Sequence, residues 1–313
     1  MGVNFENTSV AEGFNIFEKL TSEKISHGGH NNAINLYILK IHDKLFSYNK
    51  LYKYILDNIC QYVFNRRKNL NEKESKTLIL EALDHLREIN SEKDSGAGGE
   101  LGEILLYLFL EQDLQAPKLF SKVELKTSPN DYVKGADGIH FKFRINKNGV
   151  KILQLVVGEA KIKNKIKDGI EEAFTSINTY LSNNTQDIRL LDTHLMNQLI
   201  EDDEAEILKK YLLGDDLEEK ETVFGIFIGY STDYDGINDN NDEYKQKAKE
   251  ANLNQVLKYK QKIIDEIKKY NISNYEFNFY FLPFHNAQND RKVIIDQLTK
   301  KESTFSWENI RNG

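Results

Sequence analysis

The run GIHFKFRINKNGVKILQLVVGEAKI, residues 138–162, decides the expected fold. In its first part, apolar and polar residues alternate from Ile139 to Ile145, which is typical of a strand with one buried face. The second part, Val150 to Ile162, is apolar on both faces and indicates a central strand of a covered sheet. Between the two parts, Lys147-Asn148-Gly149 suits a three-residue loop with glycine in the left-handed position. The run therefore predicts a β-hairpin.

The register of this hairpin determines which side chains meet at its open end. With the three-residue loop, Asn146 faces Val150, and counting back sets Asp137 opposite Glu159. A two-residue Asn-Gly turn would instead send Asp137 to the other face of the sheet. Lys161 follows Glu159 by two residues and projects from the same face. We therefore expect two acids and one lysine to lie together.

Asp137, Glu159 and Lys161 are a suitable set for a metal-dependent phosphodiesterase. Two carboxylates hold a hard divalent cation such as Mg²⁺ or Mn²⁺, and the Ala160 carbonyl is a further candidate ligand. The lysine can stabilise the reacting phosphate or help to activate water. An acid-x-lysine triplet also arises by chance and is then usually a solvated strand edge. Two buried acids without a cation are a poor structural choice, so their conjunction favours a catalytic site.

A strongly apolar helix is expected from Gly99 to Leu110, after a glycine-rich break at 95–99. Glu100 and Glu103 lie on neighbouring turns of one face near its start. They either favour the helix dipole or add a carboxylate to the acidic cluster. We favour Glu103 for the second role, because it enters the hydrophobic section that must contact the sheet. Glu100 stays open as the alternative.

The order of these motifs resembles the PD-(D/E)xK nuclease superfamily: a helix glutamate, then Asp137, then Glu159-x-Lys161, then a helix. Gly135-Ala136 stands where that superfamily usually has a proline, at a position that varies among its members. More narrowly, the chain resembles the HamA family, the effector nucleases of the Hachiman anti-phage system. That similarity lies in the segments Gly99–Glu103, Lys134–Gly138 and Gly158–Lys161.

The resemblance implies a restriction-endonuclease-like core and a Mg²⁺- or Mn²⁺-dependent deoxyribonuclease. It also implies a HamB-like helicase partner that restrains the nuclease and senses DNA. The chain contains no Walker-type phosphate loop, so ATP hydrolysis would come from such a partner. The alternative is a non-catalytic module that keeps the nuclease fold to bind nucleic acid or a partner.

The composition is that of an ordinary soluble globular protein, with 313 residues, 40% hydrophobic and 29% charged. Cys60 is the only cysteine, so no intrachain disulfide can form, which suits a reducing cytoplasm. No apolar run reaches membrane-spanning length, and the amino terminus carries no secretory signal. We therefore expect a cytoplasmic protein without a membrane association.

The overall net charge of −7 is unfavourable for DNA binding, so a DNA contact would depend on local clusters of basic residues. Candidate DNA contacts are the lysines beside the proposed site and in the loop before it: Lys126, Lys134, Lys163, Lys165 and Lys167. A second basic stretch spans 245–269, and an acidic block at 201–221 is a candidate partner contact. A solvated helix face is the default reading of such charge runs.

We expect an α/β fold in which a mixed central sheet is flanked by helices. Residues 1–95 are expected to be mostly helical and to offer a docking surface, and residues 96–313 to form the nuclease core. His27 and His30 form only a weak metal pair, and His140 is expected to be structural or solvent-facing. Further strands are expected at 33–41, 121–125, 223–230 and 276–284, and helices at 48–65, 72–90, 166–181 and 242–270.

Overall fold

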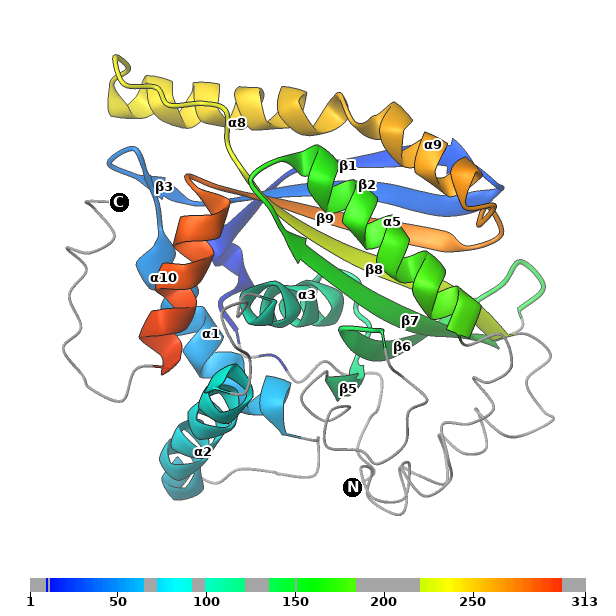
Figure 1. Ribbon diagram of the computed structural model, residues 1–313, viewed down its shortest axis with the longest axis horizontal. Coiled ribbons are helices and arrows are strands. Elements are labelled where there is room, and N and C mark those ends of the chain that lie inside the picture. The colour runs from blue at the N-terminus through cyan, green and yellow to red at the C-terminus, as the bar shows by residue number, and fades with distance from the viewer. Residues whose placement is uncertain are drawn as a thin grey trace.

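The computed structural model describes residues 10, 12–64, 72–91, 99–121, 135–149, 151–183 and 220–299. Its centre is a seven-stranded sheet in the order β1-β2-β9-β8-β7-β6-β5 (Figure 1). The neighbours β2, β9, β8 and β7 run parallel, whereas β1, β6 and β5 are each antiparallel to the strand that they join. The strands of the sheet are β1 (Phe17–His27), β2 (His30–Leu39), β5 (Lys118–Ser121), β6 (Gly138–Ile145), β7 (Lys151–Ile162), β8 (Lys220–Ser231) and β9 (Glu276–Phe284).

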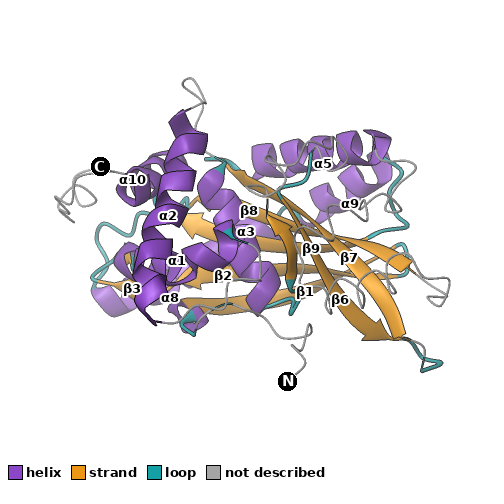
Figure 2. Ribbon diagram, turned by 90° about the horizontal axis from the view of Figure 1, so that it is seen from below, coloured by secondary structure: helices purple, strands orange, loops and turns teal. Residues whose placement is uncertain are grey.

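Helices cover both faces of this sheet, which confirms the expected α/β architecture. On one face, α3 packs against β7 and β8, with α1, α2 and α10 beside it (Figures 1 and 2). On the other face lie α5, α8 and α9. The helices are α1 (Tyr48–Val63), α2 (Glu72–Ser91), α3 (Glu100–Gln112), α5 (Ile166–Asn183), α8 (Asn241–Leu257), α9 (Lys260–Lys269) and α10 (Ala287–Thr299). Two short strands, β3 (Ile41–His42) and β4 (Leu45–Phe46), pair with each other beside the sheet.

The residues of β7 explain why the sheet is covered on both sides. Val156 and Ile162 belong to the core under α3, whereas Leu155 and Val157 belong to the core under α5. Such a strand cannot leave either face in water without exposing apolar area, at about 25 cal/mol per Å². The apolar run in the sequence therefore predicted a central strand correctly.

Helix α3 is buried from Glu100 to Glu111, as its composition indicated. Two glycines bring it close to β7. A Cβ atom at Gly158 would lie 2.8 Å from Leu106 Cδ2, and one at Gly102 would lie 3.3 Å from Ala160 Cβ. These contacts place the first turn of α3 against the part of β7 that carries the proposed catalytic triplet.

The amino-terminal region contributes strands to the central sheet as well as the helices α1 and α2, and the expected division at residue 95 stays a prediction. Both β1 and β2 belong to the central sheet, and β2 pairs with β9, so residues on either side of position 95 share one sheet. The strand β1 was not predicted because its sequence, FEKLTSEKISH, is mostly polar. An edge strand with a solvated face tolerates that composition. The docking role of residues 1–95 stays a prediction.

Two other elements differ from their predicted ranges. The helix expected at 242–270 is interrupted by a turn at Lys258–Tyr259, which separates α8 from α9. Of the strand expected at 121–125, only Ser121 is described, as the last residue that is given for β5, and residues 122–125 lie outside the described ranges. The remaining predicted strands and helices are present as β2, β8, β9, α1, α2 and α5. No helix in the described ranges is long and apolar enough to span a membrane.

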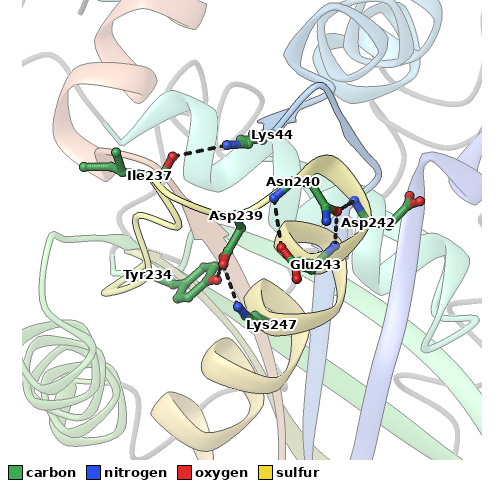
Figure 3. A network of polar contacts seen from close by, with 8 residues as sticks. All are labelled: Lys44, Tyr234, Ile237, Asp239, Asn240, Asp242, Glu243 and Lys247. Atoms are coloured by element: carbon green, nitrogen blue, oxygen red, sulfur yellow. Dashed lines mark hydrogen bonds and ion pairs between the residues drawn. The ribbon is translucent and has the colours of Figure 1, made fainter.

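A polar network fixes the start of α8 (Figure 3). The side chain of Asn240 accepts the N–H groups of Asp242 and Glu243 at 3.0 Å each. The side chain of Glu243 in turn accepts the Asn240 N–H at 3.1 Å, which completes a capping box. Lys247 binds Asp239 at 2.6 Å one turn further on. The charged residues of this region thus serve local structure.

Candidate active site

The hairpin of β6 and β7 has the register that the three-residue loop predicts. Gly138 pairs with Gly158, and the N–H of Asp137 donates to the Gly158 carbonyl at 2.8 Å. Gly149 has φ +79°, the left-handed conformation expected at the end of the loop. Continuing the register by one residue sets Asp137 opposite Glu159.

Both acids are buried at this end of the hairpin: Asp137 is 8% exposed and Glu159 4%. The Oδ2 atom of Asp137 accepts the N–H of Ala160 at 2.8 Å, which fixes the carboxylate against β7. The ammonium of Lys161 forms an ion pair with Glu159 Oε1, so the lysine lies on the same face, as predicted. The structure therefore brings Asp137 of one strand together with Glu159 and Lys161 of the next.

The pKa of the Glu159 carboxyl is raised to about 7. Burial is the largest cause, and the negative charge of Asp137 is the second. Lys161 and a hydrogen bond from Ser176 in α5 act in the opposite direction. Two buried carboxylates repel each other, and a divalent cation between them would compensate their negative charge. Their oxygen atoms are also the ligands that a hard divalent cation prefers.

The two glutamates at the start of α3 lie in the same electrostatic neighbourhood. The hydroxyl of Tyr62 donates to Glu103 Oε2 at 3.4 Å. The pKa of Tyr62 is raised well above its usual value by burial and then by the charges of Glu103, Asp137 and Glu100, in that order. Tyr62 therefore lies close enough to the acids of α3 and to the acid at the head of β6 for their charges to act on it.

The acids do not form a complete ligand set as the side chains stand. Within the described ranges, no group of three or more His, Cys, Asp and Glu side chains is placed to hold a metal ion. Asp137 and Glu159 fit as two ligands, and the Glu103 carboxylate is engaged by Tyr62. The further ligands, Ala160 and one of the α3 glutamates, stay predictions.

Three residues near the site were not anticipated from the sequence. Tyr62 comes from α1, Ser176 from α5 and Arg291 from α10. Burial lowers the pKa of Arg291, and the negative charge of Glu100 acts against that shift. The three residues are far apart in the chain and no local motif marks them, so only the packing of the helices reveals them.

The lysines that follow β7 are mostly engaged in ion pairs. Lys163 meets Glu172 at 2.7 Å, and Lys167 meets Glu171 at 3.9 Å. Lys165 is exposed and has no ion pair with a described residue. Two of the three proposed DNA contacts in this stretch therefore have acidic neighbours on α5, and DNA binding by this group stays a prediction.

The other predicted contact regions are described only in part. Lys126, Lys134 and residues 201–219 lie outside the described ranges. Glu221, at the end of the acidic block, belongs to β8 and forms an ion pair with Arg144. That residue therefore links β8 to β6 within the sheet.

The predicted role of His140 is confirmed. It is buried, and its Nδ1 atom lies 2.8 Å from the Ala116 carbonyl oxygen, so it is structural. His27 contacts the hydroxyl of Ser273 at 3.0 Å. Neither histidine is part of a metal-binding group among the described residues.

A family model for HamA matches residues 15–298. The chain belongs to the HamA family. The match begins two residues before β1 and ends one residue before the end of α10, so it includes the amino-terminal strands as well as the hairpin. None of the curated proteins matches the chain. HamA membership thus confirms the family resemblance that the motifs indicated.

Proposed function

We propose that this chain is a Mg²⁺- or Mn²⁺-dependent deoxyribonuclease that acts as the effector of an anti-phage defence system. The observation that carries the proposal is the hairpin register, which sets buried Asp137 against buried Glu159 with Lys161 on the same face. Membership in the HamA family supports the defence context.

In this proposal, Asp137 and Glu159 hold the metal ion, with the Ala160 carbonyl and Glu103 as further ligands and Glu100 as the alternative to Glu103. These residues would hold a divalent ion, which would supply activation of a water molecule and charge compensation at the reacting phosphate. Asp137 is already oriented by the Ala160 N–H, so its carboxylate is held in place before an ion arrives.

Lys161 has a separate role in the proposal. Its ammonium neutralises the charge that develops on the phosphate oxygens, or orients the attacking water. In the structure it forms an ion pair with Glu159. With Glu159 as a metal ligand, the lysine would be available to the phosphate.

The proposed partners are DNA and a HamB-like helicase. An unrestrained, non-specific nuclease would damage the DNA of its own cell, so we expect the helicase to keep the chain inactive until DNA and ATP are engaged. Candidate DNA contacts are Lys126, Lys134, Lys163, Lys165 and Lys167. The acidic block at 201–221 and the first 95 residues are the candidate docking regions.

Cleavage of supercoiled plasmid by the purified chain tests the nuclease activity. We expect nicked or linear product with Mg²⁺ or Mn²⁺, and none with a chelator or with Glu159→Ala. Glu250→Ala, which removes an exposed acid of α8, is the matched control and should cleave like the wild type. Metal-independent cleavage, or cleavage by Glu159→Ala, would contradict the proposal.

One observation favours the second candidate, a non-catalytic binding module. The ion pair of Lys161 with Glu159 balances one of the buried acids without any metal. DNA binding that needs no divalent cation, together with no cleavage under any metal condition, would support that module. Cleavage that depends on Mg²⁺ would exclude it.

Co-expression tests the restraint by a partner. We expect the wild-type chain alone to be toxic, and the toxicity to disappear with Glu159→Ala or with the helicase encoded beside it. High-level expression without toxicity, and no helicase in the purified sample, would contradict the restrained-effector model.

A further inference from the structure

Tyr62 lies near the end of α1, where neighbouring residues fix its position. The side chain is 1% exposed, and its ring packs against that of Tyr107 with the centroids 5.6 Å apart. The ammonium of Lys118 donates to the main-chain oxygens of Tyr62 and Phe64 at 3.1 and 2.8 Å. Because the backbone and the ring are both held, the hydroxyl has a defined direction.

That hydroxyl is directed at the first turn of α3. It donates to Glu103 Oε2 at 3.4 Å, and the charges of Asp137 and Glu100 also act on it. Glu103 is only 3% exposed, so its carboxylate is held within the protein. A phenol that donates to a buried carboxylate fixes the orientation of that carboxylate.

A neutral donor is a suitable neighbour for a metal ligand. It orients the carboxylate but leaves the negative charge available to the cation, and such outer partners tune metal affinity. The charge of Glu100 acts on Tyr62 as well, but it also acts on the guanidinium of Arg291 in α10. Helix α10 is itself held at the end of β7, where the Gln288 side chain donates to the Ile162 carbonyl at 2.7 Å. The two glutamates of α3 are therefore supported in different ways.

We propose that Tyr62 is a positioning residue that holds Glu103 toward a divalent metal ion shared with Asp137 and Glu159. The inference rests on the proposed function and extends it in two respects. It gives a residue of α1 a role at the site, and it selects Glu103 over Glu100 as the ligand from α3.

The test replaces Tyr62 with Phe, which removes only the hydroxyl. Tyr54→Phe is the matched control, because Tyr54 lies on the same helix, is also buried, and its hydroxyl has no hydrogen-bond partner among the described residues. Calorimetry with Mn²⁺ on the metal-free full chain should give a dissociation constant about tenfold higher for Tyr62→Phe. Tyr54→Phe should bind Mn²⁺ like the wild type.

Plasmid cleavage provides a second measurement on the same proteins. We expect the Mg²⁺ concentration for half-maximal cleavage to rise by a similar factor in Tyr62→Phe. The rate at saturating Mg²⁺ should stay within about threefold of the wild type, since the hydroxyl acts through the ligand rather than on the phosphate. A general loss of packing would lower the saturated rate and leave the Mg²⁺ dependence unchanged.

A double-mutant cycle links the hydroxyl to Glu103. In a Glu103→Gln background, Tyr62→Phe should cause no further loss of Mn²⁺ affinity. Additive losses, or wild-type Mn²⁺ affinity in folded Tyr62→Phe, overturn the inference. If Tyr62→Phe does not fold, the Mn²⁺ affinities of Glu103→Gln and Glu100→Gln test the inference instead. A larger loss of affinity in Glu103→Gln than in Glu100→Gln supports the inference, and an equal or smaller loss overturns it.

The same measurements separate this inference from the proposed function. A wild-type chain that binds no Mn²⁺ and cleaves no plasmid overturns both. Mn²⁺ binding that is lost in Asp137→Asn but unaffected by Tyr62→Phe overturns only the role of Tyr62.

Discussion

Two regions of the molecule use the same charged residue types in opposite ways. Along α8 and α9, lysines meet acids of β1 at the surface, as in the ion pair of Lys249 with Glu18 at 2.7 Å. Both of those side chains are more than a third exposed, at 37% and 43%. At the end of the β6–β7 hairpin, Asp137 and Glu159 are instead buried against each other.

This difference in environment determines what each region contributes. An exposed ion pair is worth about 0–1 kcal/mol, because water and salt screen it and two long side chains lose freedom. Two buried like charges are destabilising and raise the pKa of at least one acid. The surface pairs are explained by structure alone, whereas the buried acids suit the divalent cation that we propose. Substitutions of the buried acids should therefore affect cleavage, whereas substitutions of the surface pairs should affect only stability. The predictions below run from the largest expected effect to the smallest.

The largest effect is expected for the buried acids. Asp137→Ala and Glu159→Ala should each lower Mg²⁺-dependent cleavage by roughly 1,000-fold or more, because each removes a proposed metal ligand. The melting temperature should stay the same or rise, since the repulsion between the two carboxylates is removed. Mn²⁺ binding should weaken as well, so cleavage assays, thermal unfolding and calorimetry with Mn²⁺ check the three expectations. Unchanged Mn²⁺ binding in both variants would remove these residues from the site.

Lys161→Ala should have the next largest effect, a loss of about 10²–10³-fold in cleavage rate. Mn²⁺ binding should persist, because the lysine acts on the transition state rather than on the ion. Lys161→Arg should restore the rate only in part, since a planar guanidinium differs from an ammonium in reach and proton chemistry. Wild-type turnover in Lys161→Ala would make this lysine a structural partner of Glu159 and nothing more.

The pKa of Glu159 predicts a change of stability with pH in the metal-free chain. The folded carboxyl has a pKa of about 7, above the ordinary value of 4.5. As the pH rises from about 4.5, the unfolded chain loses this proton first, so the free energy of unfolding falls until about pH 7 and then levels off. The contribution lost over this window is on the order of 3 kcal/mol at most.

Glu159→Gln tests that contribution directly, because it removes the titrating carboxyl and leaves the other acids of the chain in place. Urea unfolding should be measured at pH 5, 6, 7 and 8. The free energy of unfolding of the variant should rise relative to that of the wild type as the pH rises. Mg²⁺ at pH 8 should then stabilise the wild type more than the variant, since only the wild type offers both carboxylates. If the free energies of unfolding of the two proteins differed by the same amount at every pH in this range, the raised pKa of Glu159 would be contradicted.

The hairpin and its acids could be predicted because the information is local. Loop length fixes the register, and alternation fixes the face, so Asp137 and Glu159 could be set opposite each other from the sequence. The apolar run of β7 and the apolar character of α3 likewise predicted burial on both sides. The family motifs lie in these same segments, and the match over 15–298 agrees with them.

What could not be predicted depends on packing between distant segments. The polar sequence of β1 gives no strand signal until β2 is beside it. Nothing between 242 and 270 breaks a helical pattern, yet a turn at Lys258–Tyr259 lets α9 follow the sheet. Tyr62 looks like one more apolar position of α1, and only its contact with Glu103 connects it to the site.

The smallest effect is expected at the surface pairs, which complete the contrast with the buried acids. Lys249→Ala and Lys260→Ala each break one ion pair with β1, to Glu18 and Glu23. Each should lower the free energy of unfolding by less than about 1 kcal/mol, and high salt should reduce the difference further. Cleavage by both variants should equal that of the wild type. A loss of more than about 2 kcal/mol, or a defect in cleavage, would show that α8 and α9 are coupled to the site. In that case, exposure would not separate structural charges from functional ones in this protein.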